Sequence, residues 1–485
     1  MRRIQSIGGN RHAVFLVSPR ETLSFHYERH PDDPRVMHTL TLEVDEFGQV
    51  RRSVSIGYPR RAGYAEPEPK LATSFGTMLA HDQTRLYIAA TENRYTNDFT
   101  DATVTPNVHR ISKLFETITA ELTGIMLAAS QSAITNLFSF HELDTQWSVV
   151  WDDAHDIPYE EIPASDIDGI GVLPAIPTRR IVEHTRTLYR SDDLTGQLPL
   201  GQLESMALPG RSFHLALTSG FITRIFGNLV PDATLTEGGY VQFPGMNAWW
   251  IPSSNIFYSS GDADTPTQER AEARVHFYLP RRTVDPFGAV SRVAYDPYDL
   301  LPATASDAVG NVTTTENDYR VLHPFHIIDA NGNSTEAAFD TLGLVVGTAV
   351  MGKTTEQLGD SLVGFNQDLA EAVMLAHLAN PLNSPDAILG TATSCMLYDL
   401  FAYSRTRDAI QPDPPVVYTL TRETHVADLT VNQTAPYQHA FSYSDGFGRE
   451  IPRDTQRDEN KQAEKQEMIF GTIQIIMCHT ESVLR

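Results

Sequence analysis

The stretch VDPFGAVSRVAYDPYD, residues Val284 to Asp299, decides the fold because its pattern returns at a constant interval. Its first half contains Asp-x-x-Gly, and its second half contains an aromatic residue followed by Asp. Counted along the sequence, the first half recurs after 22 residues as DAVGN and after another 22 as DANGN. The second half recurs at the same interval as Asn-Asp and then as Phe-Asp. This agreement between registers indicates a repeated structural unit.

The Asp-x-x-Gly positions predict turns between twisted strands. Gly at the fourth place suits a positive φ, and Asp at the first place can accept hydrogen bonds from the backbone of the same turn. The predicted turn residues are Asp285 and Gly288, Asp307 and Gly310, Asp329 and Gly332, with outlying copies at Asp45 and Gly48 and at Asp445 and Gly448. The aromatic-Asp positions are Tyr295 with Asp296, Asn317 with Asp318, and Phe339 with Asp340. We expect Tyr295 and Phe339 to pack on the face of a sheet.

These features together predict the fold class. A strand, turn and strand unit cannot bury its own apolar face, so neighbouring units must associate to form a continuous core. We therefore predict a mainly β protein, with a winding strip of antiparallel sheet and a few inserted helices. Polar and apolar residues alternate over 13–58, which predicts hairpin strands. Apolar residues at helical spacing predict a helix over 109–129 and another, interrupted by glycines, over 354–379 before Pro381.

The chain divides into five predicted regions. We expect strands with one helix over 1–157, a β-rich region over 158–280, and the 22-residue repeats over 281–353. A helical insertion with a return to strands follows over 354–452, and a divergent tail over 453–485. An acidic stretch with several prolines, 158–177, is expected to be a surface connection.

Length and composition limit the classes of function. The chain has 485 residues, more than one hydrophobic core usually supports, and 41% of them are hydrophobic. Its 37 Lys and Arg residues against 61 Asp and Glu residues give a net charge of -24, which argues against nucleic-acid binding. The sequence shows no apolar window of about 18 residues and no recognisable signal peptide, so we expect neither membrane insertion nor general export.

Candidate chemical motifs do not combine into a predicted active site. The two cysteines, Cys395 and Cys478, lack metal-ligand spacing, and Cys395 is expected to be a buried, inert thiol. His26 and His30 in HYERH would lie about 13 Å apart on a strand, too far for one zinc ion. The carboxylates of WDDAHD, 151–156, have no paired acid that we can identify, which favours a solvated loop. We predict no enzyme activity, no cofactor and no metal.

Two further features leave alternatives open. Trp249 and Trp250 could form a sugar-stacking platform, although aromatic packing within a strand is favoured. Asn311, Asn333 and Asn432 lie in N-x-S/T sequons, which matter if the protein enters a eukaryotic secretory route.

The repeat resembles the YD repeat of Rhs proteins, and several other blocks resemble the TcdB-type B component of insecticidal toxin complexes. These blocks are HAVFLVSPRETLSFHYERHPDDPRVMHTLTLEVDEFGQVRRSVSIGYPRR, RRIVEHTRTLYRSDDLTGQLPLGQLESMALPG, GGYVQFPGMNAWWIPSS, LVGFNQDLAEAVMLAHLANP and HAFSYSDGFGRE. The resemblance implies that 1–157 and 158–280 correspond to the middle and C-terminal region of that component. It implies a structural role in a hollow β shell that encloses a cytotoxic passenger, with the toxin C component and a pentameric A-component channel as partners. It carries over no catalytic residue.

The departures from this family lead to further expectations. Nothing upstream of residue 13 resembles the propeller of the family, and the tail after Arg449 does not resemble its continuation. We therefore expect a fragment or frameshifted chain that is poorly soluble alone, because its strand edges are exposed. The resemblance also implies an extracellular location within a toxin complex. The alternatives are a carbohydrate-binding or cell-surface-binding YD-repeat protein without cargo, and a non-functional relic.

Overall fold

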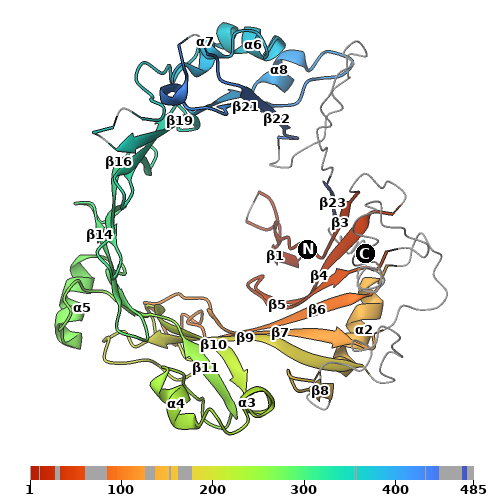
Figure 1. Ribbon diagram of the computed structural model, residues 1–485. Coiled ribbons are helices and arrows are strands. Elements are labelled where there is room, and N and C mark those ends of the chain that lie inside the picture. The colour runs from red at the N-terminus through yellow and green to blue at the C-terminus, as the bar shows by residue number, and fades with distance from the viewer. Residues whose placement is uncertain are drawn as a thin grey trace. The chain divides into compact units, whose positions relative to one another are not determined.

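A computed structural model describes residues 2–9, 11–27, 33–60, 85–125, 137–151, 155–161, 177–353, 355–356, 358–431, 433–446 and 472–477. The chain forms two compact units. The first comprises Met1–Ile256, Asp285–Phe287 and Lys465–Arg485, and the second comprises Phe257–Val284 and Gly288–Glu464. Both are built mainly from antiparallel strands (Figure 1), which confirms the predicted fold class.

The first unit is built around a 10-stranded sheet with the order β11-β10-β9-β7-β6-β5-β4-β3-β23, and β8 pairs in parallel with β9. The strands are β3 (Glu21–His26), β4 (Arg35–Val44), β5 (Val50–Gly57), β6 (Tyr87–Tyr95), β7 (Leu114–Thr123), β8 (Asp156–Ile157), β9 (Thr178–Arg190), β10 (Leu208–Thr218), β11 (Ala248–Pro252) and β23 (Thr472–Met477). A separate hairpin joins β1 (Arg2–Gln5) to β2 (Val14–Leu16), and the helices are α2 (Phe140–Val150), α3 (Ser219–Phe226) and α4 (Asp232–Glu237). The hairpin strands predicted within 13–58 are confirmed, because β4 pairs antiparallel with β3 and β5.

The core of the first unit follows from alternation along its central strands. Leu40 on β4 faces Val54 on β5, and both side chains are buried together with Ile88 of β6. Leu143 of α2 packs into the same core. The helix begins at Ser139, whose side chain and backbone amide exchange hydrogen bonds with Glu142 in a capping box.

The helix predicted over 109–129 is wrong, because these residues include the central strand β7. The side chains of β7 alternate between half-buried and buried positions from Phe115 to Thr123. Leu114, Ile118 and Leu122 lie four residues apart, a spacing that shares one face in a helix and also in a strand. Pairing with β6 on one side and β9 on the other satisfies the backbone of the strand, and this tertiary context decides the conformation.

The second unit contains an 11-stranded antiparallel sheet in which every strand follows its neighbour in sequence order, from β12 to β22. The strands are β12 (Asn255–Phe257), β13 (Arg282–Val284), β14 (Val290–Tyr295), β15 (Pro302–Ser306), β16 (Val312–Asp318), β17 (His323–Ile328), β18 (Asn333–Phe339), β19 (Val345–Lys353), β20 (Ser394–Asp399), β21 (Val416–Arg422) and β22 (Tyr437–Tyr443). Each 22-residue repeat supplies two of these strands, so the sheet grows by one hairpin per repeat.

Helices are inserted at two places in the second unit. These are α5 (Pro266–Val275), and then α6 (Glu371–Ala379), α7 (Asp386–Leu389), α8 (Ala402–Thr406) and a 3-10 turn η3 (Val426–Asp428). Figure 1 shows α6, α7 and α8 along the part of the sheet that holds β19 to β22. The helix predicted over 354–379 is therefore correct only for its last part, which ends before Pro381. Gly359 and Gly364 both have positive φ, at 84° and 78°, and this backbone conformation interrupts a helix.

A second core lies beneath these helices. Cys395 and Leu397 of β20 pair with Leu420 and Tyr418 of β21, and all four side chains are buried. The apolar surroundings raise the pKa of the Cys395 thiol to about 12, so this cysteine is buried and stays protonated, as expected for an inert thiol. Cys478 lies outside the described residues.

Candidate functional site: the repeat sheet

The Asp-x-x-Gly turns fix one edge of the repeat sheet through the Asp side chain. At Asp329, the carboxylate Oδ1 accepts hydrogen bonds from the backbone amides of Asn331 (2.9 Å) and Asn333 (2.8 Å). The Asp329 amide also donates to the Asn333 carbonyl, which closes the turn. Gly332 has a φ of 86°, a value that side chains strongly disfavour. The carboxylate and the glycine together determine where one strand ends and the next begins.

The same arrangement recurs at the related positions. Asp307 accepts from Val309 and Asn311, Asp285 accepts from Phe287, and Asp45 accepts from Phe47 and Gln49, with donor-acceptor distances of 2.9–3.0 Å. The glycines Gly288, Gly310 and Gly48 all have positive φ. Asp445 lies just after β22, whereas Gly448 is outside the described residues.

Two of these turns contain a further hydrogen bond. The side-chain amide of Asn311 donates to Asp307 at 2.7 Å, and that of Asn333 donates to Asp329 at 3.0 Å. These side-chain bonds, joined by bonds from backbone amides, lower the pKa of both aspartates below the ordinary value. The two asparagines of the sequons therefore serve as turn residues. The third sequon residue, Asn432, is outside the described residues.

The aromatic-Asp positions fix the opposite edge of the sheet by the same means. Asp296 Oδ1 accepts from the amides of Tyr298 and Leu300 at 3.0 Å each. Asp318 accepts from Arg320 at 2.8 Å, and Asp340 accepts from Leu344 at 2.8 Å. Sequence reasoning assigned a turn role to the other set of aspartates and missed it here. The signal was present, because the six aspartates from 285 to 340 recur every 11 residues when counted along the sequence.

The residue before each of these aspartates connects strands of the repeat. The Tyr295 hydroxyl donates to the Pro280 carbonyl at 3.0 Å, and the Asn317 amide donates to the Pro302 carbonyl at 3.0 Å. Asn317 therefore replaces the hydrogen bond of an aromatic residue, although not its bulk. Phe339 is buried with 5% of its surface exposed, whereas Tyr295 is half-buried. The prolines also follow the 22-residue interval, a second signal that sequence reasoning missed.

A buried ionic cluster in the first unit was not predicted. Glu116 of β7 accepts hydrogen bonds from His184 (2.8 Å), Arg186 (2.7 Å) and Arg94 (2.9 Å). Burial opposes ionisation of Glu116, but the hydrogen bonds and charges of His184 and Arg186 outweigh it and lower the pKa to about 2. The glutamate is 3% exposed, so the cluster links three strands within the sheet. No local motif could reveal it, because its members come from distant parts of the sequence.

The two tryptophans do not form an exposed platform. Trp249 and Trp250 of β11 are 5% and 0% exposed. The ring of Trp250 lies 4.7 Å from that of His184 and 5.2 Å from that of Phe243, with both pairs nearly perpendicular. The sugar-stacking interpretation of these residues is therefore wrong, and aromatic packing is confirmed.

The remaining polar motifs are separated or fall outside the described residues. His26 ends β3, and His30 is not described. Asp156 forms an ion pair with Arg179, whereas residues 152–154 are not described. Within the described ranges, no group of three or more His, Cys, Asp or Glu side chains is placed to hold a metal ion. No described helix is long and apolar enough to cross a membrane.

Comparisons with known proteins point to toxin complexes. The solved structures that resemble this chain include a crystal structure of TcdB2-TccC3, with 19% identity and a TM-score of 0.43. A Photorhabdus luminescens Tc holotoxin pore also has 19% identity and a TM-score of 0.43. Each covers 93% of this chain, but the chain spans about a fifth of their length, 19% and 21% respectively. No curated protein matches the sequence. Residues 1–105 match the family described as the insecticide toxin TcdB middle/C-terminal region, so the resemblance inferred from the sequence is confirmed for this stretch.

Proposed function

We propose that this chain is a non-enzymatic structural component of an insecticidal toxin complex, in which it forms part of the wall of a hollow β shell. The shell would enclose a cytotoxic passenger and deliver it. The observation that supports this role is the 11-stranded sheet, whose repeat turns are capped by aspartate carboxylates along both edges. The family match over residues 1–105 supports a toxin-complex setting.

The sheet has the physical properties that a wall needs. Each inner strand is hydrogen-bonded to a neighbour on both sides, so its backbone polar groups are satisfied without further layers. The aspartate caps fix the register of consecutive strands, and a slip of one residue would exchange the two faces of the sheet. A wall of this kind excludes proteases by geometry and requires no catalytic residue.

The proposed partners follow from the same setting. We propose that the chain associates with a toxin C component, which would supply the rest of the shell and the passenger, and acts with a pentameric A-component channel. Its proposed location is extracellular, as part of the assembled complex.

The test is co-expression of the full chain with a C component that carries its passenger. We expect the two chains to co-purify and the passenger to resist added protease, compared with the C component expressed alone. A double variant, Asp307→Ala with Asp329→Ala, should reduce this protection because two turns lose their caps. Asp408→Ala removes an aspartate whose side chain is 93% exposed and should have no effect. Failure to co-purify, or a passenger digested as fast as in the C component alone, would refute the proposal.

A further inference from the structure

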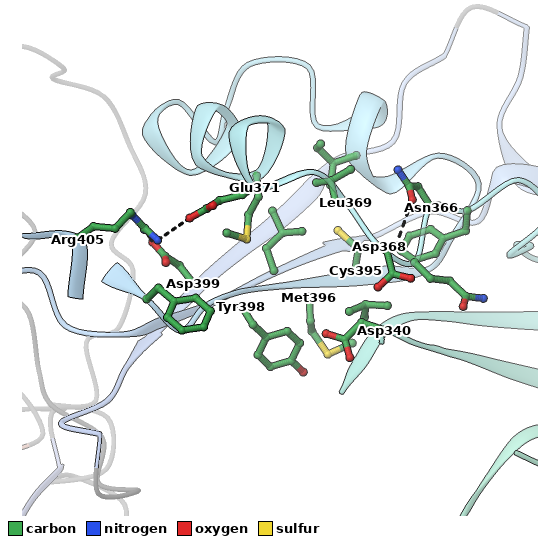
Figure 2. A pocket seen from close by; sticks show the side chains of 17 residues that line it. Asp340, Asn366, Asp368, Leu369, Glu371, Cys395, Met396, Tyr398, Asp399 and Arg405 are labelled. Carbon is green, nitrogen blue, oxygen red and sulfur yellow. Dashed lines mark hydrogen bonds and ion pairs between the residues drawn. The ribbon is translucent and has the colours of Figure 1, made fainter. Parts of the chain in front are cut away.

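A pocket of about 280 Å³ lies in the second unit between the sheet and the inserted helices (Figure 2). Its floor is apolar and includes Phe365, Leu369, Met374 and Leu397. The volume is near the lower end of the range of about 300–1,000 Å³ that is typical of small-molecule sites. The pocket therefore suits a guest of side-chain size rather than a large cofactor.

The charged residues that line the pocket are mostly acidic. They are Asp340, Asp368, Glu371, Asp399 and a single base, Arg405. Arg405 is already engaged, because it donates to Glu371 at 3.0 Å and forms an ion pair with Asp399. The remaining carboxylates give the pocket an excess of negative charge, which favours a cation over an anion.

Asp399 gives a second, independent indication of a ligand. Its residue surface is 5% exposed, and one carboxylate oxygen, Oδ2, bonds to Arg405. The other oxygen, Oδ1, is buried and has no hydrogen-bond partner among the described residues. A buried carboxylate oxygen without a donor is costly, and native proteins usually provide one. A guest with N–H donors could supply the missing bond.

Other lining residues also suit a cationic guest. Asp368 Oδ1 accepts hydrogen bonds from the hydroxyl (2.7 Å) and the amide (2.9 Å) of Thr341, and these bonds lower the pKa of Asp368 and keep it ionised. The Tyr398 hydroxyl donates to the Val345 carbonyl at 2.8 Å, which holds the ring in place. Aromatic ring faces attract cations, and Phe401 adds a second ring to the lining.

We propose that this pocket binds a lysine or arginine side chain presented by an extended segment of a partner protein. Such a side chain combines an apolar stem with a terminal cation, which matches an apolar floor below acidic groups. A carboxylate guest would meet like charges. An uncharged apolar guest would leave Asp399 Oδ1 without a donor. The inference concerns the inserted helices and β20, and it stands apart from the shell role of the repeats.

The test uses the full chain and the probe peptide acetyl-Gly-Leu-Lys-Leu-Gly-amide in isothermal titration calorimetry. Two matched peptides replace the lysine with norleucine or with glutamate. We expect saturable binding of the lysine peptide at one site and at least about tenfold weaker binding of the other two. Binding should also weaken as salt is raised.

Matched variants of the protein locate the site. Glu371→Gln removes a charge whose side chain is 61% exposed, and it should weaken binding about twofold to fivefold. Glu316→Gln removes a charge of similar exposure, 66%, from the repeat sheet and should leave the affinity unchanged. Asp399→Asn, with folding checked by circular dichroism, should weaken binding further. No binding of the lysine peptide, equal binding of the norleucine peptide, or equal effects of Glu371→Gln and Glu316→Gln would overturn the proposal.

Discussion

Replacement of Glu116 by Gln should destabilise the first unit strongly. The change keeps the shape of the side chain but removes the negative charge that receives hydrogen bonds from His184, Arg186 and Arg94. A pKa of about 2 in the folded protein, against an ordinary value of 4.5, corresponds to about 3 kcal/mol of stabilisation of the ionised form. Loss of a buried partner charge has a cost of similar size in other proteins, about 3–5 kcal/mol.

The assay exploits the distribution of tryptophan in the chain. All 4 tryptophans lie within Met1–Ile256, so tryptophan fluorescence during urea unfolding reports on the first unit. The matched control is Glu43→Gln, because Glu43 has a 44% exposed side chain and pairs with Arg52 at 3.3 Å. Exposed pairs of this kind contribute about 0–1 kcal/mol, so the control should lose little stability.

The pH dependence of the Glu116 variant provides a second check. Since the pKa of Glu116 is lowered on folding, its stabilisation is fully present above about pH 4.5 and is lost as the pH falls toward about 2. The stability gap between the wild type and Glu116→Gln should therefore narrow across this range. A loss below about 1 kcal/mol at neutral pH, or a gap that stays constant down to about pH 3, would refute the reasoning.

Three further predictions concern the second unit. Gly359→Ala places a Cβ 2.4 Å from a backbone carbonyl oxygen, whereas Gly310→Ala meets nothing within 4 Å, so thermal unfolding should show a loss of about 3 kcal/mol or more for the first and about 1 kcal/mol for the second. Equal losses would contradict this contrast. The Cys395 thiol should resist iodoacetamide in the native protein and react after urea unfolding, as mass spectrometry would show, and rapid native labelling would argue against its burial. Asp360→Ala leaves the buried guanidinium of Arg422 without its counter-charge and should cost about 3 kcal/mol in urea unfolding followed by circular dichroism, while an unchanged midpoint would exclude an important ion pair.

The repeat sheet could be predicted from the sequence because its turns depend on local chemistry. Asp caps its own turn and Gly adopts the required φ, so each turn leaves a trace of two residues at a fixed interval. The second set of turns escaped notice because Asp296 and Asp318 have no glycine three residues later. Their turns instead place Asp299 and Leu322 at positive φ, near 55°, a conformation that their residue types do not announce.

The features that could not be predicted depend on distant partners. β7 has apolar residues at a spacing that is compatible with a helix, and only its pairing with β6 and β9 settles the conformation. Glu116 likewise looks like a solvent-exposed residue in the sequence, since its three basic partners lie 22, 68 and 70 residues away. The carboxylates of the pocket become neighbours only when the inserted helices pack against β20.

The uniform aspartate caps along both edges of the sheet have a consequence for how such a protein can change in length. An internal duplication of 22 residues would add one complete hairpin with its own two caps, and it would restore the original strand direction at the point of insertion. With neighbouring strands about 4.8 Å apart, each such event would extend the sheet by about 10 Å. A duplication of 11 residues would reverse the direction of every later strand. Genetic change could therefore adjust the span of this structure in steps of two strands while leaving the surrounding architecture intact.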